Sequence, residues 1–201
     1  MTTVMRRLTL ALLLVLGLAA CAAEPVSAPP AAIEAARYQH PGPTTLTLFT
    51  GIKSSSGSSS HSALMVSGSE RVIFDPAGTF KHETVVEHND VIHGATPELV
   101  WTYLNYHVRP AFSMYRQDIV VSPEVAEAAL RAVRSYGAVP KAHCSQAVTD
   151  ILEDLPGFEG FPRNWYPTKT RKAFARYAGV SERFYVHDPN AANSIMLAQP
   201  R

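Results

Sequence analysis

The side chains best suited to covalent chemistry in this 201-residue sequence are two cysteines, Cys21 and Cys144. Cys144 lies in the segment Lys-Ala-His-Cys-Ser (141–145), which follows Pro140 and which we expect to open a helix. Backbone N–H groups at a helix N-terminus favour a thiolate and can also bind an oxyanion. An unpaired cysteine can instead be a small buried hydrophobic residue. The placement favours Cys144 as the nucleophile of an acyl-transfer reaction.

A nucleophilic cysteine needs a base, and His61 is our candidate among eight histidines. Residues 61–68 and 70–75 alternate as two strands joined at Gly68-Ser69, so the outer ends of this hairpin return to the same end of the ladder. His61 opens the first strand and Asp75 closes the second. We therefore expect Asp75 to accept a hydrogen bond from the His61 ring and to fix its tautomer.

Simpler interpretations exist for each of these residues. His61 also ends the polar, serine-rich loop 53–60, and Asp75 begins Asp-Pro-Ala-Gly, an ordinary turn sequence. His143 is adjacent to Cys144, but neighbouring side chains on a helix point in different directions. We therefore interpret His143 as a residue at the helix entry and not as the base.

The N-terminus has the layout of a secretion signal. Arg6 and Arg7 precede the apolar run 8–16, and small residues lead to Cys21. The apolar run is shorter than the roughly 18–20 residues of a membrane-spanning helix. Leu-Ala-Ala-Cys (18–21) resembles the bacterial lipobox, which implies cleavage after residue 20 and a diacylglycerol on Cys21. Ala22 in place of Asp implies, by the same resemblance, the periplasmic face of the outer membrane.

The remaining chain divides into a tether and one domain. Residues 21–43 are rich in Ala and Pro, which predicts a lipidated tether, and residues 44–201 are long enough for a single folded domain. A formal net charge of +1 and the absence of a basic run argue against a nucleic-acid partner. We expect a monomer held on the membrane through Cys21, with a peptide or acyl substrate and no cofactor.

Hydrophobic periodicity and turn residues predict a mixture of strands and helices without regular alternation, which is typical of an α+β fold. Ser122 and Pro123 mark one helix start, and Gly137 marks its end. The predicted strands cover residues 44–52, 61–68, 70–75, 113–121 and 184–187. The predicted helices cover residues 97–107, 122–136, 144–155 and 168–177.

Together these motifs resemble a known superfamily. His-Ser-Ala-Leu (61–64), the strand that carries Asp75, and His-Cys-Ser-Gln-Ala-Val (143–148) are similar to the circularly permuted branch of the NlpC-type papain-like enzymes, which includes YiiX-like, YaeF-like and lecithin:retinol acyltransferase-like proteins. The resemblance implies an antiparallel sheet carrying His61 packed against a helix carrying Cys144. Gln146 stands where the superfamily usually has glycine, which puts the shape of the cleft in doubt.

The resemblance implies an envelope cysteine hydrolase that cleaves an amide or acyl bond, in a peptidoglycan peptide, a protein or a lipid. A non-catalytic lipoprotein that uses the same fold as a binding module is the alternative, since fold does not determine function.

A metal enzyme is a rival because His82, His88, His93 and His107 are close in sequence, but they lack a His-Glu-x-x-His pattern. The serine run 54–60 lacks the Gly-x-Ser-x-Gly elbow of a serine hydrolase.

Overall fold

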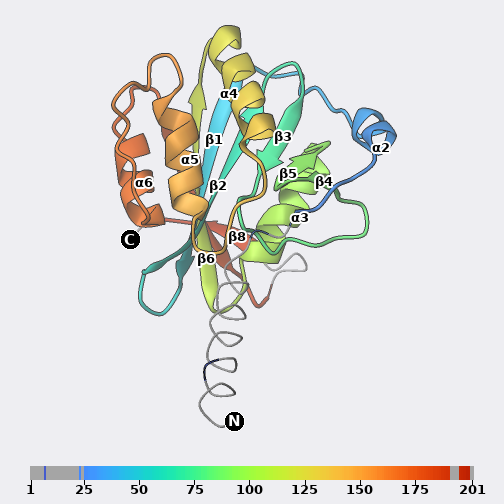
Figure 1. Ribbon diagram of the computed structural model, residues 1–201. Helices are drawn as coiled ribbons and strands as arrows, with labels where there is room; N and C mark the ends of the chain where they lie inside the picture. The colour runs from blue at the N-terminus through green and yellow to red at the C-terminus, as the bar shows by residue number, and fades with distance from the viewer. Residues whose placement is uncertain (1–6, 8–22, 24, 191–194, 200–201) are drawn as a thin grey trace.

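The computed structural model describes residue 7, residue 23, residues 25–190 and residues 195–199 of the chain. Within them an eight-stranded antiparallel sheet is combined with five helices, so the expected α+β class is confirmed (Figure 1). The strand order is β4-β5-β3-β2-β1-β6-β7-β8. Most neighbours in the sheet are also neighbours in sequence; the exceptions include β1 next to β6 and β3 next to β5.

The strands are β1 (Thr45–Lys53), β2 (Ser59–Ser67), β3 (Arg71–Phe74), β4 (Val86–His88), β5 (Val91–His93), β6 (Phe112–Val120), β7 (Ser181–His187) and β8 (Ile195–Ala198). The helices are α2 (Pro30–Ala35), α3 (Pro97–His107), α4 (Pro123–Tyr136), α5 (Cys144–Glu153) and α6 (Pro167–Phe174). The helices and strands predicted between residues 44 and 187 are present, with ends shifted by a few residues. β4, β5, β8 and α2 were not predicted.

Each face of the sheet buries its own hydrophobic core, because successive residues of a strand point to opposite faces. On one face, Leu64 and Val66 of β2 pack with apolar residues of α4, α5 and α6. The helices α4 and α5 lie in front of the sheet in Figure 1. On the other face, Ala63 and Met65 of β2 pack against α3. We call these the α5 face and the α3 face.

The first half of β2 has a neighbour on only one side. β2 pairs with β1 from Ser59 to Ser67, but its pairing with β3 begins only at Leu64 and Phe74. β3 ends there, and the backbone N–H of Asp75 donates instead to the carbonyl of Asp90, at 2.8 Å. The divergence of β3 leaves an opening beside His61 and Ser62 into which another element can reach.

The Ala/Pro-rich segment expected to be a tether makes contacts where it is described. It contains α2, and Ser27 forms an isolated β-bridge with His88 at the edge of the sheet. The N–H of Ala28 donates to the carbonyl of Glu87 at 3.0 Å, and the N–H of Arg71 donates to the carbonyl of Tyr38 at 2.7 Å. Composition does not reveal such docking, because it is made by backbone groups that every residue carries.

Candidate active site

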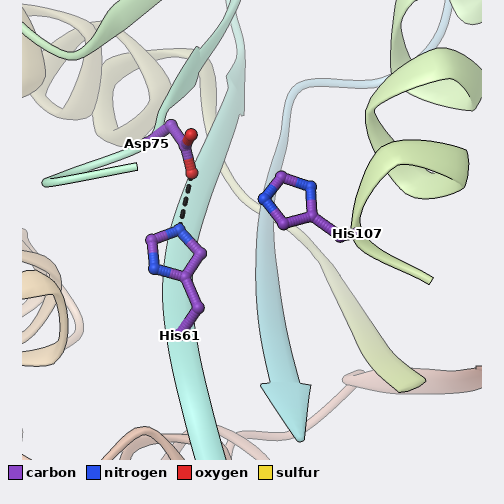
Figure 2. A group of neighbouring side chains, drawn as sticks. All are labelled: His61, Asp75 and His107. Carbon is purple, nitrogen blue, oxygen red and sulfur yellow. Dashed lines mark hydrogen bonds and ion pairs between the residues drawn. The ribbon is translucent and has the colours of Figure 1, made fainter. Parts of the chain in front are cut away.

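His61 and Asp75 meet at the end of the β2–β3 hairpin, as the sequence predicts. The Nε2 atom of His61 donates to Oδ1 of Asp75 at 2.6 Å (Figure 2). Asp75 is 4% exposed, so water does not compete for the carboxylate. With Nε2 engaged, Nδ1 is the His61 nitrogen left for a second partner.

Cys144 is the first residue of α5, and its side chain is buried. The groups that act on the charge of its thiol are the His61 ring and the backbone N–H groups of Ser62 and Ser145. The helix start, predicted from the sequence, thus brings Cys144 from the α5 face to His61.

The charges of these three residues support one another. Burial raises the pKa of the Cys144 thiol, but the hydrogen bond from His61, its charge and the two backbone N–H groups outweigh burial and bring the pKa below its usual value. Burial also opposes the charged form of His61, yet Asp75 and Cys144 raise the pKa of His61 to about 10. Both shifts run in the direction that favours a thiolate on Cys144 beside an imidazolium on His61.

Tyr103 is a site residue that the sequence did not predict. Tyr103 belongs to α3 and its side chain is fully buried. Its hydroxyl donates to Oδ1 of Asp75 at 2.7 Å, the same oxygen that accepts from His61. Burial disfavours the Asp75 carboxylate, but His61, His107 and Tyr103 together bring its pKa below the usual value. Only the helical spacing of α3 could have suggested that Tyr103 points inward; its partner lies 28 residues away.

His107, at the last turn of α3, stacks on the catalytic candidate. Its ring lies parallel to that of His61, with an interplanar angle of 2° and ring centroids 5.8 Å apart. Nδ1 of His107 donates to the carbonyl of Tyr103 at 2.9 Å, so Nε2 is the nitrogen that faces His61 and Asp75 (Figure 2). Burial lowers the pKa of His107 to about 4, and the ring is therefore neutral at neutral pH.

Asp90 connects the segments that carry Asp75 and Cys144. Its buried Oδ2 atom accepts from the N–H of Ala77, at 3.0 Å, in the turn after Asp75. The same oxygen accepts from the N–H of Val139, at 2.8 Å, in the loop before α5. Asp90 thus holds the turn after Asp75 to the loop before Cys144, and the sequence did not predict this.

The remaining histidines lie elsewhere. His143 precedes α5 at the N-cap position; its Nδ1 donates to the carbonyl of Lys141, and its ring contacts Trp165. His82, His88 and His93, which were considered with His107 as the basis of a rival metal site, do not form a ligand group among the described residues. The group that has ligand atoms within 4.8 Å of one another is His61, Asp75 and His107 (Figure 2).

A cavity of about 260 Å³ lies beside the His61 ring. The turn after Asp75 contributes Gly78 and Thr79, and the end of α3 contributes His107. Gly78 is required here, because a Cβ atom at this position would overlap the Asp75 carboxylate. The chain therefore provides open space next to His61 for a small group.

Comparisons with known proteins leave the resemblance as a hypothesis. No family model, curated protein or solved structure matches this chain. Among the described residues, none of the helices has the length and apolar character needed to span a membrane. Cys21, the lipidation candidate, and nearly all of the predicted signal peptide lie outside the described residues.

Proposed function

We propose that this chain is a cysteine hydrolase of permuted papain-like type, with Cys144 as nucleophile, His61 as general base and acid, and Asp75 as the residue that orients His61. The observation that carries the proposal is the position of His61. One ring nitrogen is bound to a buried carboxylate at 2.6 Å, while the ring also interacts with a thiol at a helix N-terminus. A merely structural cysteine has no need of an ionised partner.

The reaction follows from this geometry. The Cys144 thiolate attacks the carbonyl carbon of an amide or ester, and backbone N–H groups at the start of α5 bind the oxyanion. His61 gives its proton to the leaving amine or alcohol as the C–N or C–O bond breaks, leaving a thioester. His61 then takes a proton from water, whose oxygen attacks the thioester to release the acid and restore Cys144.

Location limits the choice of substrate. If the Leu-Ala-Ala-Cys motif directs lipidation of Cys21, the domain is held at the periplasmic face of the outer membrane. The substrates within reach there are peptidoglycan peptides and membrane lipids. We propose a peptidoglycan peptide amide or a lipid acyl bond as the target.

The site can be tested before the substrate is known, by the alkylation of Cys144 with iodoacetamide as a function of pH. Mass spectrometry of the peptide that contains Cys144 separates its reaction from that of Cys21. We expect the rate to rise through a pKa below the model thiol value of about 8.5. His61→Ala should move this inflection to 8.5 or above, because burial then acts without its counter-charge.

His143→Gln is the matched control, since it removes an imidazole next to Cys144 in sequence whose ring is instead bound to the Lys141 carbonyl and packed against Trp165. It should leave the inflection in place. An inflection that His61→Ala does not move would exclude His61 as the base. The substrate itself should appear when cell-wall fragments and lipids are incubated with the protein and with Cys144→Ala, and the products are compared by mass spectrometry.

Two other functions make different predictions. A binding module would leave Cys144 as slow as a model thiol at neutral pH. A metal enzyme could use His61, Asp75 and His107, whose ligand atoms lie within 4.8 Å of one another. In that case, added Zn²⁺ should raise activity and a chelator should abolish it. The hydrolase proposal expects the chelator to have no effect.

A further inference from the structure

The cavity beside His61 has one fully charged side chain besides the imidazolium, and that side chain is Arg109. The lining residues include no carboxylate. The cavity therefore presents positive charge to whatever enters it, at a position next to the proposed base.

Arg109 is held by its backbone and by aromatic rings. Its N–H and carbonyl both pair with Phe112, at 3.0 and 2.8 Å, which closes a tight turn. Its guanidinium lies 5.3 Å from the ring centre of Tyr106 and 5.8 Å from that of Phe112. Such stacking fixes the plane of a guanidinium and leaves its N–H edge available.

That edge has no acceptor among the described residues. Among the described residues, Arg109 makes no ion pair or side-chain hydrogen bond, whereas Arg116 and Arg171 are each paired with a carboxylate. A guanidinium that is oriented but unpaired beside a cavity is suited to bind a carboxylate with two parallel hydrogen bonds.

The chemistry indicates which part of the substrate the cavity holds. The acyl group stays on Cys144, while the leaving group departs with a proton from His61. His61 lines the cavity and Cys144 does not. Provided that the Cys144–His61 mechanism holds, we propose that this cavity is the leaving-group subsite and that Arg109 binds a carboxylate carried by the leaving group, as in an amino acid or short peptide released by amide cleavage.

The size of the cavity fits such a group. At about 260 Å³ it lies below the range of roughly 300–1,000 Å³ that is usual for whole small-molecule ligands. One arginine matches the single charge of a carboxylate. The proposal thus favours a peptidoglycan-type peptide amide over a lipid acyl bond.

The test uses paired reagents that differ only in charge: iodoacetyl-glycine and iodoacetyl-glycinamide, with the β-alanine and γ-aminobutyrate homologues to vary the reach. Rates of Cys144 alkylation are measured on the full chain by mass spectrometry of the Cys144 peptide. For at least one length, the ratio of the acid rate to the amide rate should fall about tenfold in Arg109→Gln, as expected for a lost charge-assisted hydrogen bond. Arg109→Lys should keep part of the preference.

Arg131→Gln is the matched control, because it removes the same charge from an exposed position on α4 outside the cavity. It should leave the ratio unchanged. The Arg109 proposal is overturned if Arg109→Gln does not alter the acid-to-amide ratio at any length, or if Arg131→Gln lowers that ratio equally. The hydrolase proposal is still supported in that case if Cys144 reacts rapidly with the amide reagents and its pKa is shifted. If the amide reagents react with Cys144 no faster than with a model thiol, the hydrolase proposal itself is rejected.

Discussion

The two faces of the sheet contribute to the site by different means. On the α5 face, Cys144 is placed by a helix whose inner side is apolar, including Val148 and Leu152, both fully buried. On the α3 face, His61 and Asp75 are placed by short polar contacts, among them the hydroxyl of Tyr103. The position of Cys144 thus depends on packing, and the position of His61 depends on hydrogen bonds and charge.

This difference has a consequence for mutations. Loss of packing on the α5 face should lower stability while a folded molecule keeps its reactive thiol. Loss of a polar contact on the α3 face should change the charge of the site with less effect on stability. Each face can therefore be tested with a variant that should leave the contacts of the other face unchanged.

The largest effect is expected where the two faces meet. Cys144→Ala and His61→Ala should each lower kcat by about 10⁴-fold or more, and the double variant should be scarcely slower than either, because residues that act as one unit are not additive. The measurement is turnover of the substrate identified from cell-wall or lipid fragments. Multiplied losses in the double variant would show that the two residues act separately.

Asp75→Asn should have the next largest effect on turnover, about 10²- to 10³-fold. An amide can still hold the ring, but it stabilises the imidazolium poorly and can favour the wrong tautomer. The pKa of His61 should fall from about 10, because Asp75 is the main group that raises it. The alkaline limb of the pH–rate profile would then move to lower pH. If the alkaline limb stays in place, it reports the titration of a group other than His61.

Leu152→Ala tests the packing of the α5 face without changing any charge. Truncating a fully buried leucine should lower the free energy of unfolding by about 2–5 kcal/mol. Urea unfolding measures this loss. The inflection for iodoacetamide alkylation of the folded protein should stay within about 0.3 pH units of wild type, since a shift of one pKa unit needs about 1.4 kcal/mol of changed electrostatics. A larger shift would mean that packing also sets the charge of Cys144.

These contrasts also explain what sequence could predict. The β2–β3 hairpin and the start of α5 are local patterns, and they were sufficient to predict His61 beside Asp75 and Cys144 at a helix N-terminus. Tyr103 and Asp90 were missed because their partners lie far away in the chain and their residue types carry no local signal. The docking of residues 26–28 was missed because it depends on the edge of β4, which is itself only three residues long.

Tyr103→Phe removes one polar contact from the α3 face and should have a smaller effect. The buried Asp75 keeps its bond to His61 but loses a donor, so its pKa should rise and stability should fall by about 1–2 kcal/mol. The thiol inflection should move slightly upward. Tyr136→Phe is the control: its hydroxyl donates to Asp150 at 2.9 Å on the partly exposed surface of α4 and α5, and its loss should cost less. Equal losses in the two variants would argue against a special role for Tyr103.

Asp90→Asn should have the smallest effect, and it tests what joins the two faces. An asparagine oxygen can still accept from Ala77 and Val139, and Asn tolerates the φ of 64° at this position.

Burial raises the pKa of Asp90, so the folded state disfavours its charge. This acid therefore stabilises the fold below its unfolded pKa, and that contribution is lost as pH rises through the folded pKa. Asp90→Asn should remove this decline and leave the free energy of unfolding at pH 7 equal to wild type or up to about 1 kcal/mol higher. Urea unfolding at pH 4 to 8 measures the difference. A loss above about 2 kcal/mol at pH 7 would mean that the negative charge, and not only the shared oxygen, holds the turn after Asp75 to the loop before Cys144.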